Sequence, residues 1–166
     1  MRNLFMVLWA FPGCAEDTPA SSDHTMGELE AFLEATQMLI DGHVSAVEAA
    51  STLDEASGAE ADYLATWALV GSEIEVVLTE LEDCTLSGAA SDHMVATRAA
   101  LADLDTEMGA HQAQHEACAT LADCVATEAG HGGIMSAGVD TCLELHEAMH
   151  DLVTCAPADS MGTMGM

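Results

Sequence analysis

Two histidines and two cysteines stand close together in the stretch HQAQHEACATLADC, at 111–124, of an otherwise alanine-rich chain. Imidazole nitrogens and thiolates are the ligands that zinc and copper prefer, so this stretch could form part of a metal site. The cysteines could instead close a disulfide, and the histidines could simply pack inside a helical core. The elements that carry these residues decide between the three interpretations.

An internal repeat places the same residue types elsewhere in the chain. Comparing the sequence with itself at one fixed offset pairs His43 with His111 and Glu60 with Glu128. Further pairs at this offset are Met26 with Met94, Leu33 with Leu101, Glu48 with Glu116, Thr52 with Thr120 and Leu53 with Leu121. Because all these pairs share one offset without a gap, we infer an internal duplication.

Composition and capping signals predict that each copy is a helical hairpin. Alanine, glutamate, leucine and methionine are abundant, whereas the chain has only 3 prolines and is 4% aromatic, which favours an all-α fold. In both copies a threonine precedes an acid by three residues, in TLDE at 52–55 and TLAD at 120–123. This is the spacing of a helix N-terminal capping box. The hairpins should therefore turn near 51 and 119, and a glycine-rich rival turn at 130–133 is rejected because its counterpart in the first copy has no helix breaker.

The predicted architecture is an up-down-up-down four-helix bundle, made of two duplicated helical hairpins, from residue 24 to 155. The linker between the hairpins is placed near SGAAS, at 87–91. Apolar residues recur at alternating steps of three and four in every helix, as in bundle cores. In the fourth helix this stripe is predicted to include Gly138 and Leu145, which leaves His146 and His150 beside it.

Polar residues interrupt the four stripes at matching levels. In an antiparallel hairpin, residues equidistant from the turn lie at one level, so His43 faces Glu60 and His111 faces Glu128. If both hairpins turn at the same end, these four residues form one layer of the core. His115 and His131 occupy the adjoining layers.

A buried, unpaired carboxylate costs several kcal/mol, so something must compensate Glu60 and Glu128. Internal His–Glu hydrogen bonds would do so without a metal. The other interpretation is a transition-metal site, and six residues are its predicted ligands: His43, Glu60, His111, His115, Glu128 and His131. The stretch EAGH at 128–131 resembles the Glu-x-x-His step of ferritin-like metal-binding four-helix proteins, which implies carboxylate and imidazole ligands on facing helices. Iron, manganese or zinc would suit these ligands, and copper would suit the thiols and thioethers of the chain.

The cysteines predict two disulfides. Cys118 and Cys124 flank the second hairpin turn, and Cys84 and Cys155 end the second and fourth helices at the opposite end of the bundle. Each pair can be bridged if its Cα atoms lie within about 7 Å. Cys142 is left over as a small buried hydrophobe. Alternatively, the thiolates serve a soft metal such as copper(I), together with the methionines of a disordered Met/Gly-rich tail at 156–166.

The net charge excludes one class of partner. The chain has 29 acidic residues against Arg2 and Arg98, and its formal net charge is -27. Such a surface repels phosphate backbones, so no nucleic acid is expected as a partner. The acidity is interpreted either as a solvated coat or as a surface that attracts cations.

The N-terminal stretch MRNLFMVLWAFPGC is typical of a secretory signal, with one positive residue followed by a short apolar run. Its PGC ending resembles the lipobox of bacterial lipoproteins. That resemblance implies a signal peptide at 1–13, lipidation of Cys14, a tether at 14–23 and a periplasmic or outer-membrane location. A signal peptide cleaved elsewhere, without lipidation, is the alternative.

The sequence contains no nucleophile–base arrangement and no phosphate-binding glycine loop, which argues against an enzyme. A redox centre at the carboxylate–histidine layer stays open. The favoured function is an exported, lipid-anchored metal-binding bundle that serves sequestration, transport or sensing. The alternative is a metal-free structural or interaction lipoprotein stabilised by disulfides.

Overall fold

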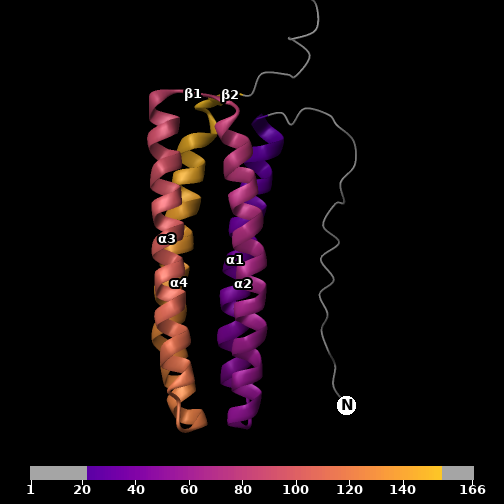
Figure 1. The fold of residues 1–166 in the computed structure, drawn as a ribbon, viewed down its shortest axis with the longest axis vertical. Coiled ribbons are helices and arrows are strands. Elements are labelled where there is room, and N and C mark those ends of the chain that lie inside the picture. Colours follow the sequence, from indigo (N-terminus) through magenta and orange to yellow (C-terminus); the bar gives the residue numbers. More distant parts are fainter. Residues whose placement is uncertain (1–21, 155–166) are drawn as a thin grey trace, which may run out of the picture.

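The computed structural model describes residues 22–154, and Figure 1 shows four long helices that lie side by side. In chain order they are α1 (Ser22–Ala49), α2 (Leu53–Glu82), α3 (Gly88–Glu116) and α4 (Leu121–His150). Two short strands, β1 (Thr85–Leu86) and β2 (Val153–Thr154), complete the described part of the chain. The predicted up-down-up-down bundle of two hairpins is confirmed.

Both hairpin turns lie where the capping signals placed them. The Thr52 hydroxyl accepts a hydrogen bond from the Glu55 amide at 3.2 Å and begins α2. Thr120 begins α4 with a full capping box, in which its hydroxyl accepts from the Asp123 amide and its own amide donates to the Asp123 carboxylate. These bonds satisfy amide groups that the first turn of a helix leaves without partners. The glycine-rich stretch at 130–133 continues α4 without interruption.

The linker between the hairpins differs from the prediction of 87–91. Ser87 caps α3 by accepting a hydrogen bond from the Ala90 amide at 3.1 Å, and the small residues after it form the first helical turn. The glycine and serine residues of 87–91 suggested a loop, but serine is also a preferred N-cap residue and can begin a helix. The chain instead crosses at 83–87, where β1 pairs with β2 in antiparallel register, Thr85 with Thr154 and Leu86 with Val153. This strand pair ties the linker to the chain after α4, at the end opposite both turns (Figure 1).

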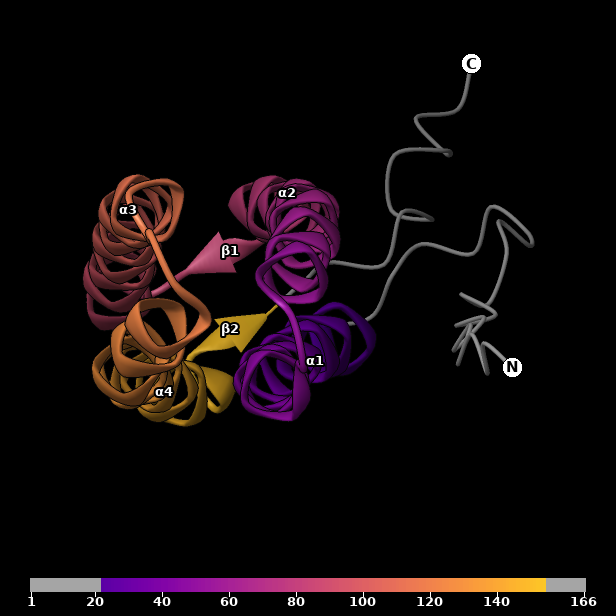
Figure 2. The same cartoon turned by 90° about the horizontal axis from the view of Figure 1, so that it is seen from below.

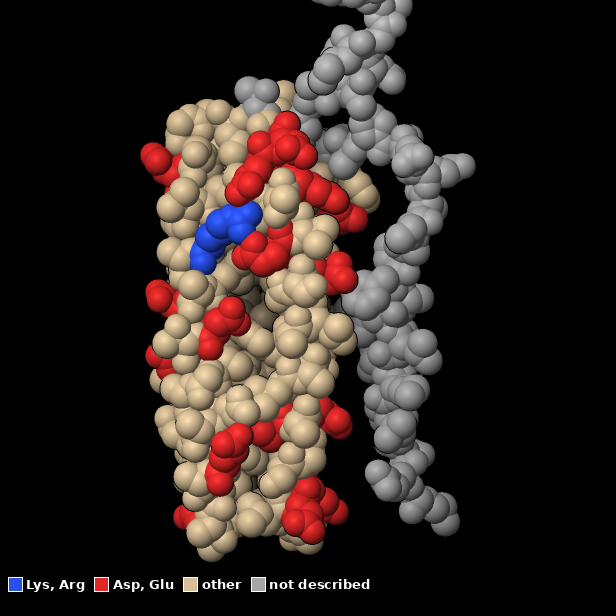
Figure 3. All heavy atoms as spheres, viewed as in Figure 1, with Lys and Arg blue, Asp and Glu red and all other residues tan. Residues whose placement is uncertain are grey.

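The two hairpins pack unequally against each other. Viewed along the bundle, α1 lies against α4, whereas α2 and α3 stand farther apart and touch at few points (Figure 2). Polar side chains bridge this open seam. Arg98, the only Lys or Arg between residues 22 and 154, pairs with Glu75 and Glu82, and it forms the blue patch among acidic groups in Figure 3. Lower on the same seam, the Trp67 indole donates to Asp105 at 2.8 Å.

The predicted core stripes are largely buried, and in the second half of α4 Cys142 and Met149 are buried as predicted. The other buried positions there are Val139, His146 and Val153, each one residue later than alternating steps of three and four predict. The buried stripe takes two successive steps of four, from His131 to Met135 and Val139, because an α-helix has 3.6 residues per turn whereas strict alternation assumes 3.5. Leu104 packs against Gly138, where a Cβ atom would lie 2.4 Å from Leu104 Cδ2.

The prediction that His146 lies beside the stripe is therefore wrong. His146 is 5% exposed, and its Nε2 atom lies 2.9 Å from the carbonyl oxygen of Met26. His150 lies at the surface as predicted. Within residues 22–154, no helix combines the length and the apolar character that crossing a bilayer requires.

Candidate metal centre

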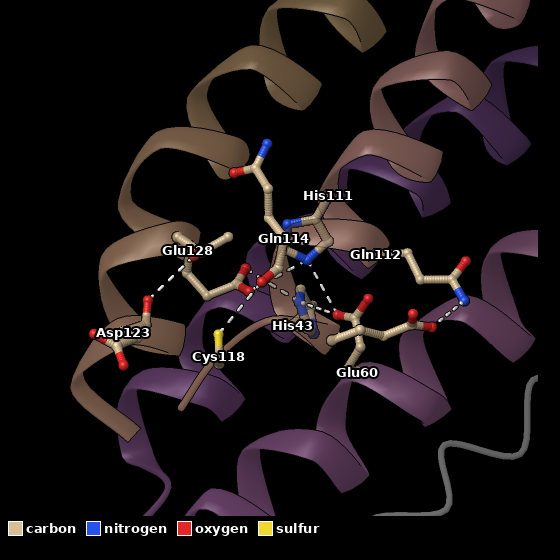
Figure 4. A network of polar contacts seen from close by, with 10 residues as sticks. His43, Glu60, His111, Gln112, Gln114, Cys118, Asp123 and Glu128 are labelled. Carbon is tan, nitrogen blue, oxygen red and sulfur yellow. Dashed lines mark hydrogen bonds and ion pairs between the residues drawn. The ribbon is translucent and has the colours of Figure 1, made fainter. Parts of the chain in front are cut away.

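Each helix contributes one residue to a buried cluster near the hairpin turns. His43 comes from α1, Glu60 from α2, His111 from α3 and Glu128 from α4, and their side chains point toward one another (Figure 4). All four are buried, with exposed fractions of 4%, 6%, 2% and 1%. The layer predicted from equal distances to the turns is thus assembled in the structure. We call it the His/Glu layer.

Four nitrogen–oxygen contacts connect the members of the His/Glu layer. His43 Nε2 lies 3.2 Å from Glu60 Oε2 and 3.1 Å from Glu128 Oε2. His111 Nε2 lies 3.1 Å from Glu60 Oε2 and 3.2 Å from Glu128 Oε1. Each histidine therefore contacts both glutamates, and each contact uses Nε2. One ligand atom from each residue lies within 4.8 Å of all the others.

These contacts are short, but most of them lack the alignment of hydrogen bonds. Only the contact between His111 Nε2 and Glu60 Oε2 has hydrogen-bond geometry. Among the described residues, His43 Nε2 and both Glu128 oxygens are buried without a hydrogen-bond partner. A four-coordinate zinc ion with bonds of about 2.0–2.1 Å places neighbouring ligand atoms about 3.3 Å apart. The spacing within the layer matches that distance, so the arrangement is suited to atoms that converge on a shared cation.

Aromatic stacking fixes the two imidazole rings. Tyr63 stacks on His43 with ring centroids 4.1 Å apart and an interplanar angle of 6°. His131 stacks on His111 at 3.6 Å and 14°. Tyr63 and His131 occupy equivalent positions in the two copies of the repeat, so the two stacks are related by the internal symmetry. Neither Nδ1 atom of His43 or His111 has a hydrogen-bond partner among the described residues, which leaves stacking and packing to orient the rings.

The electrostatics of the layer favour a positive charge between the two carboxylates. Burial lowers the pKa of His43, but the adjacent Glu128 and Glu60 outweigh burial and raise this pKa to about 9. Burial raises the pKa of Glu60, but His111 and His43 outweigh it and lower this pKa to about 2. The layer therefore holds ionised carboxylate and a proton at neutral pH when no metal is bound. A cation would replace that proton.

The two stacking residues have different electrostatic character. Burial and the neighbouring His111 lower the pKa of His131 to about 4, so this imidazole is neutral at physiological pH. Burial and the carboxylates of Glu60 and Glu128 raise the pKa of the Tyr63 phenol above its ordinary value. Both rings are therefore uncharged groups beside the layer. Uncharged surroundings strengthen the attraction between a bound cation and the carboxylates.

A cleft of about 370 Å³ lies between α3 and α4. His111 and His131 are among the residues that line it, together with the polar residues Glu107, Gln114 and Thr127. Gly130 also lines the cleft, and a Cβ atom at this position would meet nothing within 4 Å. The cleft lies on the α3–α4 side of the layer, next to the stacked rings of His111 and His131.

The other two predicted ligands lie outside the four-residue cluster. His131 stacks on His111 instead of pointing a ligand atom into the cluster, and its buried Nε2 has no hydrogen-bond partner among the described residues. His115 lies one turn from His111 and forms a separate group with Cys118 and Cys124, whose ligand atoms lie within 4.8 Å of one another.

The cysteines differ in part from the predicted disulfides. Cys118 and Cys124 are free thiols, so the disulfide predicted across the second turn is not formed in this structure. A disulfide would require an S–S bond of about 2.05 Å. In this structure the Cys118 thiol instead donates a hydrogen bond to the Gln114 carbonyl oxygen, which lies 3.7 Å from the sulfur. Cys142 is a buried free thiol, as expected. Cys155 and Cys14 lie outside the described residues, so the Cys84–Cys155 disulfide and the lipidation of Cys14 stay predictions.

Two features of the structure were not predicted from the sequence: the stacking of Tyr63 on His43 and the burial of His146. The stacking of Tyr63 on His43 has a signal in the repeat, because Tyr63 replaces the histidine of the second copy. The burial of His146 has none, because the alternating spacing placed Leu145 in the core instead. Comparison of the chain with protein-family models, with curated proteins and with solved structures found no match. The site's own chemistry must therefore carry the functional conclusion.

Proposed function

We propose that this protein is an exported, lipid-anchored bundle that binds a transition metal at His43, Glu60, His111 and Glu128, for sequestration, transport or sensing. One observation carries the metal proposal: four buried side chains from four helices make nitrogen–oxygen contacts of 3.1–3.2 Å, and of these contacts only that between His111 and Glu60 has hydrogen-bond geometry. Two imidazoles and two carboxylates suit zinc, iron or manganese. A divalent ion would balance the two carboxylates in an interior that disfavours net charge.

Metal analysis of the full chain tests this proposal. The protein should be purified without an affinity tag and measured by mass spectrometry for bound iron, zinc, manganese and copper. We expect close to stoichiometric metal in the natural sequence and in His150→Ala, whose side chain is 48% exposed and lies away from the layer. The double variant Glu60→Leu and Glu128→Leu should retain no metal at the layer.

Thermal unfolding gives the same test a second readout. A metal that binds only the folded state raises the melting temperature as its concentration increases. We expect this rise in the natural sequence and its loss in the double leucine variant. The metal-free leucine variant should unfold at an equal or higher temperature than the metal-free parent, because apolar replacement of buried ionic groups is often neutral or stabilising. Identical responses of parent and variant to every metal would overturn the proposal.

The export part of the proposal rests on the N-terminal resemblance alone. Cys14→Ser removes the residue that would carry the lipid. We expect the parent chain to fractionate with membranes and the variant to appear in the soluble exported fraction. A parent chain found soluble in the cytoplasm would contradict both export and anchoring. The metal proposal does not depend on this outcome, since the His/Glu layer is formed by residues 43–128.

A further inference from the structure

A second group of metal-ligand side chains lies one helical turn from the His/Glu layer, at the hairpin turn between α3 and α4. It consists of His115, Cys118 and Cys124, and one ligand atom of each lies within 4.8 Å of the others. His115 and Cys124 are buried and Cys118 is half-buried. The rings of His111 and His115 are 5.9 Å apart, so the two groups are close but separate.

One ring nitrogen of His115 lacks a hydrogen-bond partner in the interior. Its Nε2 atom is buried and has no hydrogen-bond partner within residues 22–154. A buried nitrogen without a partner loses its hydration and gains no hydrogen bond in return, which destabilises the folded state. The two thiols are the nearby groups with ligand atoms, and thiols are weak hydrogen-bond donors. A cation shared by the three residues would compensate this cost.

The first copy of the repeat shows that packing alone does not require these residues. At the positions equivalent to His115, Cys118 and Cys124 it has Val47, Ala50 and Ala56. Those apolar residues form a core cluster together with Cys124, at the same end of the bundle. The same backbone therefore closes equally well with valine and alanine. The three metal-ligand residues appear together in one copy only, which points to a function of the second copy.

We propose that His115, Cys118 and Cys124 form a second metal centre, for a thiophilic divalent cation of the Zn²⁺ type. Two thiolates and one neutral imidazole are soft to borderline ligands, unlike the nitrogen–oxygen set of the His/Glu layer. Binding releases one proton from each thiol, so Zn²⁺ gives a neutral centre, whereas copper(I) would leave a net negative charge beside Glu128. Three protein ligands leave a fourth coordination position open to water or another ligand.

The Cys124 thiol is poorly suited to ionising without a bound cation. Burial, together with the neighbouring Cys118, raises the pKa of Cys124 to about 12. Without a metal Cys124 therefore stays protonated at physiological pH. A bound cation would also connect the end of α3 to the start of α4, and would thereby clamp the turn that carries the Thr120 capping box.

Cobalt(II) is a spectroscopic probe that separates the two centres. Cobalt bound by thiolates has a strong sulfur-to-metal charge-transfer absorption in the near ultraviolet, and cobalt bound only by nitrogen and oxygen lacks it. We expect this absorption when Co²⁺ is added to the reduced full chain, and we expect Zn²⁺ to abolish it by competition. The triple variant His115→Val, Cys118→Ala and Cys124→Ala should lose the absorption, because it restores the residues of the first copy.

Two controls make the experiment specific. Cys142→Ser alters a buried thiol outside the proposed centre and should keep the absorption. The reverse transplant, Val47→His with Ala50→Cys and Ala56→Cys, should add a second equivalent of thiolate-bound cobalt. Circular dichroism should show that the triple variant keeps its helices, since the first copy folds with the same residues.

Three results would overturn the inference: no charge-transfer absorption in the reduced parent, an absorption that survives in the triple variant, or copper(I) retained where Zn²⁺ is not. The His/Glu layer is judged independently, by the metal that the triple variant still holds and by the response of the Glu60→Leu and Glu128→Leu variant. A failure of one centre is therefore distinguishable from a failure of the other.

Discussion

The two hairpins share one backbone plan and differ in the chemistry at their turns. Each contributes one histidine and one glutamate to the His/Glu layer, at equivalent positions of the repeat. Around this shared pair the first hairpin has Tyr63 and apolar residues at its turn. The second has His131 against the layer, and His115, Cys118 and Cys124 at its turn.

This difference shows which residues both hairpins share and which residues only one of them has. Both copies keep the histidine and the glutamate, so the layer needs both hairpins to be complete. His131 and the group of His115, Cys118 and Cys124 occur in the second copy only, beside the cleft that His111 and His131 line. The first hairpin thus completes the layer, and the second carries additional imidazole and thiol groups.

The largest expected effect comes from removing either histidine of the layer. His111→Ala leaves two buried carboxylates with an incomplete set of partners, which should cost about 3–5 kcal/mol of unfolding free energy and abolish metal retention at the His/Glu layer. His43→Ala should do the same, because its contacts mirror those of His111. Chemical denaturation and metal analysis measure both effects. Unequal losses of unfolding free energy or of bound metal in the two variants would show that the two hairpins do not contribute equally to the layer.

The pH dependence of the metal-free protein should expose the difference between Tyr63 and His131. Stability should increase between pH 4 and 6.5, since His131 is neutral when folded, with its pKa lowered to about 4, but protonated when unfolded. It should decrease between pH 6.5 and 9, because His43 holds its proton when folded, with a pKa of about 9, and loses it when unfolded.

The variant His131→Tyr sharpens this test by giving the second hairpin the residue of the first. Thermal unfolding across this pH range should show that the part of the rise due to His131 disappears. The decrease above pH 6.5 should remain, because it comes from His43. A variant whose profile matches the parent at every pH would show that His131 is not held neutral in the core.

A moderate effect is expected from the one place where α4 approaches α3 through a glycine. Gly138→Ala would put a methyl group 2.4 Å from Cδ2 of the buried Leu104, and overpacking of this kind typically costs about 1–3 kcal/mol. Gly133→Ala is the matched control, because a Cβ atom there meets nothing within 4 Å. The control should stabilise the helix by about 0.5–1 kcal/mol. Stabilisation by both substitutions would refute the close approach.

The smallest effect should come from the seam between α2 and α3. Arg98→Ala removes the ion pairs with Glu75 and Glu82, which are partly exposed and should contribute at most about 1 kcal/mol. The difference from the parent should shrink at high salt, because salt screens exposed charges. A loss as large as that of His111→Ala would mean that this seam, and not the buried layer, holds the hairpins together.

The sequence predicted the turns and the His/Glu layer because both follow from local rules applied twice. Threonine caps located the turns, and equal distances from those turns located His43, Glu60, His111 and Glu128. In the core of α4, Cys142 and Met149 were placed correctly but His146 was not, because strict alternation of threes and fours drifts from the 3.6 residues per turn of an α-helix. The sequence left open whether Cys118 and Cys124 close a disulfide or act as metal ligands beside His115, since the same spacing suits both.

The internal symmetry of the His/Glu layer has a consequence for the ancestry of the protein. Exchanging the two hairpins leaves the set of ligand types unchanged, because each supplies one imidazole and one carboxylate. Two identical hairpins related by a twofold axis would therefore present the same four ligands. A complete layer could thus have existed in a homodimer of a half-length chain before gene duplication and fusion made it a property of one polypeptide. In a single chain the two turns can differ, as Val47 and Ala50 in the first copy differ from His115 and Cys118 in the second, whereas in such a homodimer both turns would be identical.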